Sequence, residues 1–430
     1  MKKSMVAFMV LFASAVALMG CSKKEPDHVK NSEAQQTTVS ESITADSSLQ
    51  NINVKNITLN TFVGDDGQMV ESIEYEFDEL PDLDQITPKD FTITLEKEIY
   101  KVLDMKTENH RLILKTEPFR FLGKNVYGKD MKSTHYDFSV DCTEDALDFD
   151  KSTDSTVQTK TADDFIKGKF TGSNGIELPY WLYMPENASN LPLMLWEHGG
   201  GEVLSTSFEG ANIMNNRGAV TWIENGYDTA VLSFQFPENY EFGISENPEQ
   251  LKMMQDYNDV IYECIQDLIK KGQIDASRVY ISGASSGGGA TLRFLMQYPD
   301  LFAAAFPICA KDTLIPISKP YNLAYKLEGS LEISEEEYQK CYEGTKSLMK
   351  ENDITQVPIW FVQAENDPIC TSYTSKILDQ VLKEMGAKNN KLTLYTDEEM
   401  KAAGQTIYHS SWVLALKDKE MMDWIYSQNK

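Results

Sequence analysis

Short runs of alternating apolar and polar residues fill the first part of the chain, from about residue 51 to 150. The runs that predict strands are Val54 to Phe62, Met69 to Phe77, Phe91 to Leu95, Ile99 to Met105, Arg111 to Thr116 and Tyr136 to Val140. Turn-forming residues separate them, as at Gly64 to Gly67. Several short strands at this spacing predict a β-sandwich domain.

After Lys167 the pattern changes to apolar strands that alternate with helices. The predicted strands are Gly175 to Met184, Leu191 to Trp196, Thr229 to Phe234, Arg278 to Ser282, Phe302 to Ile308, Pro358 to Gln363 and Lys391 to Tyr395. The clearest helix runs from Leu251 to Lys271 and carries one apolar face. Apolar strands alternating with helices predict a mostly parallel sheet with helices on both faces. We therefore expect an α/β domain over residues 167–430.

Two segments do not fit these patterns. Residues 151–166 read as a linker between the domains. Residues 311–356 lie between two predicted strands and are too long for a simple connection. A helix begins within them, because Ser334 and Glu337 have the spacing of a capping box. We interpret this insertion as a cap near the active-site edge, with surface decoration as the alternative.

The N-terminus has the pattern of an export signal. Residues 1–20 contain Lys2 and Lys3 and then an apolar run that is too short to span a membrane. The run ends at Gly20-Cys21, which resembles the lipobox of bacterial lipoproteins and predicts a lipid on Cys21. Residues 21–50 are polar and predict a disordered tether. The expected location is the cell envelope, outside the cytoplasm and anchored by lipid, with ordinary secretion as the alternative.

Composition excludes several function classes. The net charge of −26 disfavours binding to nucleic acid, whose phosphates would be repelled. Anionic membrane surfaces are disfavoured for the same reason, so the lipid on Cys21 is the expected contact with a membrane. The cysteines after Cys21 are odd in number and lack C-x-x-C spacing, which predicts neither a disulfide framework nor a zinc site. We expect no metal and no cofactor.

A candidate nucleophile follows the strand that ends at Ser282. Gly283 to Gly287 form a G-x-S-x-G pattern between a strand and a helix, which is typical of a nucleophile elbow centred on Ser285. Glycines two residues to either side are needed because the sharp turn leaves no room for side chains. A glycine-rich turn that serves only close packing is the alternative.

A serine hydroxyl needs a base and a third group that orients the base. In α/β-hydrolases the acid and then the histidine follow the serine along the chain. His409 is the sole histidine after Ser285. Asp367 is the best-placed acid, because it follows a sheet strand; Glu365 is the fallback, and Asp353 and Asp397 are weaker candidates.

The reaction also needs two donors for the oxyanion. The backbone N–H of Ser286 is one candidate, since it directly follows the nucleophile. Gly200 or Gly201 would supply the other, because His198-Gly199-Gly200-Gly201 follows a strand as an HGGG-type motif. His198 itself is expected to be structural, and a glycine-rich turn without this role is the alternative.

Several segments together resemble a known family. They are Leu178 to Pro185, His198 to Glu202, Gly283 to Gly287, Phe302 to Cys309, Pro358 to Trp360 and His409 to Trp412. They are similar to signatures of bacterial prolyl-oligopeptidase-like "predicted peptidases", α/β-hydrolases related to polyhydroxybutyrate depolymerases and feruloyl esterases. The resemblance covers Lys167 to the C-terminus and implies Ser285, Asp367 and His409 as the triad. Some members carry an N-terminal immunoglobulin-like domain and act as carboxylesterases, which implies the same for residues 51–150. The insertion after Cys309 departs from the pattern.

These observations predict a lipid-anchored serine hydrolase, in the first place a carboxylesterase. Its substrate would be a small ester, a decorated polysaccharide or a peptide. A peptidase with the same triad is the alternative within the class. A surface protein that binds its ligand without catalysis is the alternative from another class.

Overall fold

The computed structural model describes residues 52–125, 133–150, 154–186, 189–238, 248–311 and 334–430. The predicted signal segment, Cys21 and the predicted tether lie outside the described residues. No helix among the described residues is both long enough and apolar enough to cross a membrane. Residues 48–430 form one compact unit.

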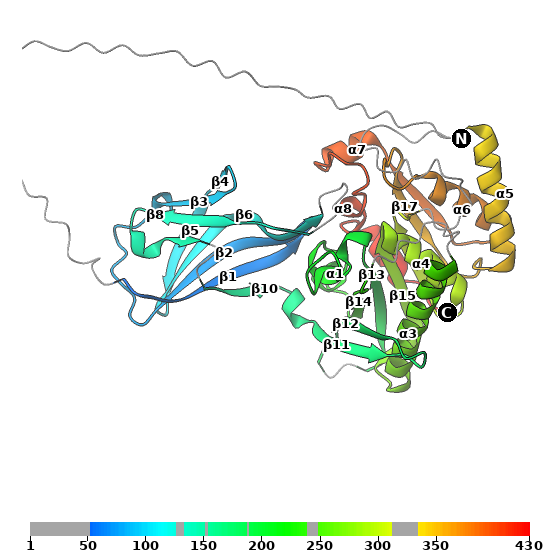
Figure 1. Cartoon of the computed structure of the whole chain (residues 1–430), viewed down its shortest axis with the longest axis horizontal. Coiled ribbons are helices and arrows are strands. Elements are labelled where there is room, and N and C mark those ends of the chain that lie inside the picture. The colour runs from blue at the N-terminus through cyan, green and yellow to red at the C-terminus, as the bar shows by residue number, and fades with distance from the viewer. Residues whose placement is uncertain (1–51, 126–132, 151–153, 187–188, 239–247, 312–333) are drawn as a thin grey trace, which may run out of the picture. The chain divides into compact units, whose positions relative to one another are not determined.

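Residues 54–159 form a β-sandwich, as the alternating pattern predicts (Figure 1). One sheet has the order β10-β1-β2-β6-β5, with β7 also paired to β6, and the other has the order β4-β3-β8-β9. Both sheets contribute to one core, which includes Ile73 and Leu112 from the first and Ile93 and Val140 from the second. The strand bounds are β1 Val54–Gly64, β2 Gly67–Phe77, β3 Phe91–Leu95, β4 Glu98–Tyr100, β5 Val102–Glu108, β6 Arg111–Asn125, β7 Ser133–His135, β8 Phe138–Cys142, β9 Phe149–Asp150 and β10 Thr156–Thr159.

Two local expectations differ from the structure. The run Ile99 to Met105 is two strands, because β4 pairs with β3 in one sheet and β5 pairs with β6 in the other. The segment read as a linker contains β10, which pairs in parallel with β1. Buried hydrogen bonds hold it there, since Gln68 Nε2 donates to Thr159 Oγ1 at 2.7 Å.

Residues 166–395 supply an eight-stranded sheet with the order β11-β12-β14-β13-β15-β16-β17-β18. β11, β12 and β14 pair antiparallel, and the pairs from β14 to β18 are parallel. This is the mostly parallel sheet that the sequence predicts, with β11 as an additional edge strand. The bounds are β11 Ile166–Thr171, β12 Glu177–Tyr183, β13 Leu191–Glu197, β14 Ala230–Phe234, β15 Ile274–Ala284, β16 Ala304–Ile308, β17 Trp360–Ala364 and β18 Lys391–Tyr395.

Helices cover both faces of this sheet because alternate residues of the strands point to opposite sides. In β13, Leu193 and Leu195 share a core with residues of α3, α4 and α6, whereas Met194 and Trp196 share a core with α2 and α9. The helix bounds are α1 Ala211–Met214, α2 Thr221–Glu224, α3 Pro248–Lys270, α4 Ser286–Gln297, α5 Glu335–Glu351, α6 Tyr373–Glu384, α7 Asp397–Ala402, α8 Trp412–Ala415 and α9 Lys419–Tyr426.

The insertion after Cys309 is described only in part, because residues 312–333 lie outside the described residues. The helix expected after Ser334 is confirmed as α5, and Ser334 Oγ accepts a hydrogen bond from the N–H of Glu337. α5 packs on α6, where Tyr338 donates its hydroxyl hydrogen to Gln380 Oε1 at 2.8 Å. Whether the insertion caps the active site stays a prediction.

Candidate active site

The elbow lies where β15 turns into α4. Ser285 has φ 58° and ψ −119°, a backbone conformation that costs a non-glycine residue about 1–3 kcal/mol. The flanking glycines are required by space. A Cβ on Gly283 would lie 2.5 Å from the carbonyl oxygen of Gly287, and one on Gly287 would lie 2.0 Å from the carbonyl oxygen of Glu197. The spacing predicted from sequence is therefore the spacing that this turn needs.

The backbone of Ser285 is fixed by the end of the neighbouring strand β16. Its N–H donates to the carbonyl oxygen of Ile308 at 3.0 Å and lies 3.3 Å from Cys309 Sγ. Cys309 also has a positive φ of 39°. Burial, and then the charge of Asp367, raise the pKa of the Cys309 thiol well above its ordinary value, so the thiol stays neutral. Sequence reasoning missed this cysteine, because nothing in its local pattern shows that it lies behind the nucleophile.

Asp367 and His409 meet at hydrogen-bonding distance although they are 42 residues apart. His409 Nδ1 lies 2.8 Å from Asp367 Oδ2, and both side chains are almost completely buried. An ionised carboxylate can only accept, so Nδ1 carries the hydrogen and Nε2 is left as the acceptor. That is the tautomer a general base requires.

Asp367 is held in place by further donors. Its Oδ1 accepts from the N–H groups of Ile369 and Cys370 at 2.8 and 2.9 Å, and its Oδ2 accepts from Gln363 Nε2 at 3.1 Å. Gln363 is the last residue but one of β17 and is fully buried. The fallback acid Glu365 is exposed. Gln363 is a second residue that sequence reasoning missed, since only its contacts show its role.

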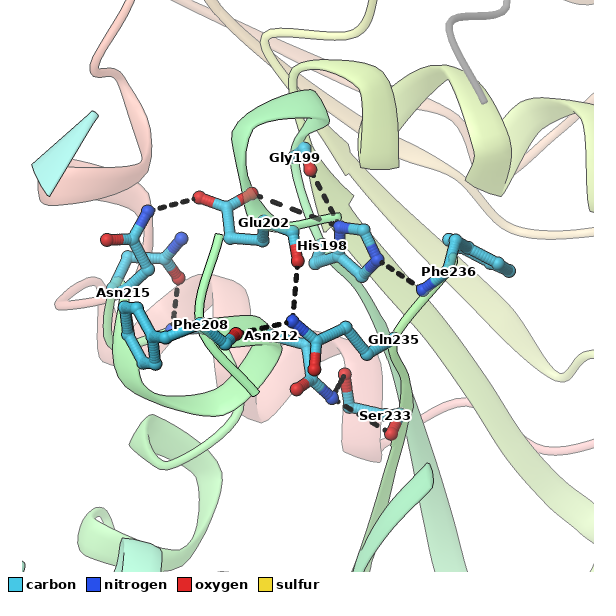
Figure 2. Close-up of polar contacts among 11 residues, drawn as sticks. His198, Gly199, Glu202, Phe208, Asn212, Asn215, Ser233, Gln235 and Phe236 are labelled. Carbon is cyan, nitrogen blue, oxygen red and sulfur yellow. Dashed lines mark hydrogen bonds and ion pairs between the residues drawn. The ribbon is translucent and has the colours of Figure 1, made fainter. Parts of the chain in front are cut away.

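The HGGG-type loop follows β13 and begins with a histidine of fixed tautomer. His198 Nε2 accepts from the N–H of Phe236 at 3.1 Å, so Nδ1 carries the hydrogen and donates to the carbonyl oxygen of Gly199 at 2.7 Å (Figure 2). Burial lowers the pKa of His198 to about 4. The ring is therefore neutral and joins two backbone segments, which agrees with the structural role expected for it.

A buried polar network supports the same loop (Figure 2). Asn215 Nδ2 donates to Glu202 Oε1 at 2.5 Å, and Gln235 Nε2 donates to the carbonyl oxygens of Glu202 and Phe208, each at 2.8 Å. Glu202 and Gln235 are almost completely buried. The network fixes Glu202 at the end of the short 3-10 turn Gly200–Glu202 and so restricts the backbone that carries Gly200 and Gly201.

The elbow and the HGGG-type loop line one pocket of about 290 Å³. Ser285 lines it together with Gly200 and Gly201, which places the candidate nucleophile and one pair of candidate oxyanion donors in the same cavity. Ser286 is buried as the first residue of α4. The pocket is also lined by residues that sequence reasoning did not assign to the site: Asp65, Asp66, Arg120, Gly199, Glu202, Asn215, Asn216, Ala284, Gly404, Gln405, Thr406, Ile407, Ser410 and Trp412.

Among the residues that the structure describes, no group of three or more His, Cys, Asp or Glu side chains is placed to hold a metal ion.

Comparison with known proteins agrees with this geometry. Residues 249–401 match the model of the prolyl oligopeptidase family, a range that includes Ser285 and Asp367. The chain is 30% identical over 218 residues to dipeptidyl aminopeptidase BIII of Pseudoxanthomonas mexicana, which aligns 48% of this chain and 30% of that protein. It is 30% identical over 148 residues to dipeptidyl peptidase family member 6 of Caenorhabditis elegans, which aligns 32% and 19%. The chain thus spans less than a third of the length of these curated relatives.

The fold has a solved counterpart along most of the chain. A thermostable esterase superposes with a TM-score of 0.65 at 23% sequence identity, covering 88% of this chain and all of that one. This likeness shows the α/β-hydrolase fold. Together with the family match, it supports a serine hydrolase of the prolyl oligopeptidase and esterase superfamily.

Proposed function

We propose that this protein is a serine carboxylesterase that works through an acyl-enzyme. The observation that carries the proposal is the 2.8 Å contact between His409 Nδ1 and Asp367 Oδ2, in a chain whose strained elbow presents Ser285 to a pocket shared with Gly200 and Gly201. The comparisons support the hydrolase class, and the choice of an ester substrate is our inference.

The proposed reaction assigns a role to each of these residues. Ser285 Oγ attacks the ester carbonyl while His409 accepts its proton at Nε2, and Asp367 stabilises the imidazolium through Nδ1–H. The N–H of Ser286 and that of Gly200 or Gly201 bind the oxyanion. His409 then protonates the leaving alcohol. Water attacks the acyl-enzyme in the same way and releases the acid.

Labelling with a fluorophosphonate tests the nucleophile. We expect one adduct, on Ser285, located by peptide mass, and no adduct in Ser285→Ala. His409→Ala should slow labelling by a large factor, whereas the control Ser139→Ala, in the β-sandwich, should label at the wild-type rate. An unlabelled wild type that is folded by circular dichroism would reject catalysis and favour a protein that only binds its ligand.

The main rival is a peptidase with the same triad. It has a specific observation in its favour, because both curated relatives are named as dipeptidyl peptidases or aminopeptidases. One solved structure, which aligns with 88% of this chain, is named as an esterase, and the choice of the ester is our inference. Parallel assays on acyl esters and on dipeptide amides separate the two. A kcat/KM on dipeptide amides equal to or above that on esters would replace the carboxylesterase proposal.

We further propose that the enzyme is anchored by a lipid on Cys21, outside the cytoplasm. The support is the sequence pattern of residues 1–21. Metabolic labelling with an alkyne fatty acid should mark the full chain and fail to mark Cys21→Ser. Equal labelling of both would reject the anchor, and release of an unlabelled protein into the medium would indicate ordinary secretion.

A further inference from the structure

The β-sandwich forms one wall of the active-site pocket. Asp65 and Asp66 lie on the turn between β1 and β2, Arg120 lies on β6, and all three line the cavity that contains Ser285. The C-terminal part of the chain holds this turn. Trp412 Nε1 lies 3.4 Å from the carbonyl oxygen of Asp65, and Lys417 Nζ forms an ion pair with Asp65 Oδ2 at 2.6 Å.

The wall also packs tightly against the loop that supports the oxyanion donors. Gly123 on β6 has φ +112°, and a Cβ there would lie 2.7 Å from the Cα of Gly67 and 3.0 Å from Asn215 Oδ1. Asn215 lines the pocket and donates to Glu202. The sandwich therefore reaches both the cavity and the network beneath it.

The chemistry of the wall indicates what it would bind. Arg120 Nη2 donates to Asp66 Oδ2 at 2.9 Å, and both side chains keep about a quarter of their surface exposed. Because the charges of Asp66 and Arg120 are paired, as are those of Asp65 and Lys417, the wall offers donors and acceptors with little net charge. Across the cavity the lining is also largely polar, with Asn216, Gln405, Thr406 and Ser410 beside Ile407 and Trp412.

We propose that the β-sandwich is part of the active site, and that Asp66 and Arg120 are specificity-determining residues that hydrogen-bond the hydroxyl groups of a polar ester such as an O-acylated sugar. A hydroxyl both donates and accepts, so one sugar edge can bond the carboxylate and the guanidinium of this pair at once. Trp412 supplies an aromatic surface in the same cavity. This inference rests on the proposed esterase function and adds its substrate class.

Two acetate esters that differ only in the alcohol test the inference. The full chain is assayed on p-nitrophenyl acetate, which has no hydroxyl group, and on an O-acetylated methyl glycoside, which keeps free sugar hydroxyls. Arg120→Met should lower kcat/KM for the glycoside roughly ten- to hundredfold relative to p-nitrophenyl acetate, mainly through KM, because a charge-assisted hydrogen bond is lost. Asp66→Asn, which keeps a turn-forming residue, should lower the same ratio.

A matched control exists in the same domain. Arg111, also on β6, pairs with Glu74 on β2 at 2.8 Å and is absent from the residues that line the described pocket. Arg111→Met should therefore leave the ratio of the two kcat/KM values unchanged, which separates loss of a binding group from a general weakening of the sandwich.

The outcomes are distinct. If the wild type cleaves p-nitrophenyl acetate but the ratio stays within twofold in both Arg120→Met and Asp66→Asn, the wall does not contact the substrate and this inference alone is rejected. Absence of activity on the glycoside in an otherwise active wild type also rejects it. If the wild type neither reacts with a fluorophosphonate nor cleaves either ester, the proposed function fails and the inference fails with it.

Discussion

Replacing Gly287 by alanine tests the link between the elbow and the oxyanion loop. The added Cβ would lie 2.0 Å from the carbonyl oxygen of Glu197 and 2.7 Å from that of His198, whereas ordinary contact begins at about 3.4 Å. Relief of the first clash requires a shift of about 1.4 Å, the difference between these two distances. Both clashing atoms are backbone, so neither can turn aside as a flexible side chain would.

The shift has two expected effects. Overpacking of this kind destabilises a core by about 1–3 kcal/mol. The displaced backbone leads directly into Gly199, Gly200 and Gly201, and a misplacement of about 1 Å can cost roughly a hundredfold in rate. We therefore expect Gly287→Ala to lower both the urea midpoint of unfolding and the second-order rate constant of inactivation by a fluorophosphonate.

Gly226→Ala is the matched control. Gly226 has φ +81° and no atom within 4 Å of a built Cβ, so alanine there meets backbone strain of about 1–2 kcal/mol without a clash. It should lose stability and keep the inactivation rate. A Gly287→Ala protein whose inactivation rate matches that of Gly226→Ala would refute the argument that the elbow and the oxyanion loop are in tight contact.

Other predictions concern charge and tautomer. Asp367→Asn should lower kcat/KM about 10³- to 10⁴-fold, because the amide favours the wrong tautomer of His409; activity within tenfold of wild type would contradict the assigned roles. Burial raises the pKa of Glu197 to about 8. The neutral carboxyl therefore contributes stability that is fully present below the unfolded pKa near 4.5 and is lost as pH rises through 8. Between pH 6.5 and 8 the free energy of unfolding should fall, and Glu197→Gln should remove that fall in urea titrations. Burial lowers the pKa of His198 to about 4, so its contribution is present above pH 6.5 and is lost as pH falls towards 4; His198→Gln should flatten stability in that lower range.

Sequence reasoning succeeds for the features that local chemistry dictates. The glycines around Ser285 are predictable because any side chain at Gly283 or Gly287 would meet backbone. His409 and Asp367 follow from chain order, and the structure brings their side chains within 2.8 Å. The roles of these residues in catalysis stay predictions that the labelling experiments address.

Other features depend on how distant segments pack, and no local pattern encodes them. Arg120 lies beyond the predicted strand Arg111 to Thr116, and only the position of the longer strand β6 beside the cavity gives it a role. Gln363 reads as the end of an apolar strand, although it holds the carboxylate of Asp367. β10 escapes prediction for a similar reason, since its short polar sequence becomes a strand only by pairing with β1.

The contact between Asp65 and Lys417 has a consequence for the order of events during folding. It joins residues 352 positions apart, and Trp412 reaches the same turn across 347 positions. At about 5–20 residues per second, a ribosome needs roughly 20–70 s to add the second partner after the first. The turn that contains Asp65 and Asp66 is thus synthesised long before Trp412 and Lys417, which contact it. Contacts of such sequence separation form late, so reactivity of Ser285 towards a fluorophosphonate should appear after the β-sandwich has folded and would report the final step of maturation.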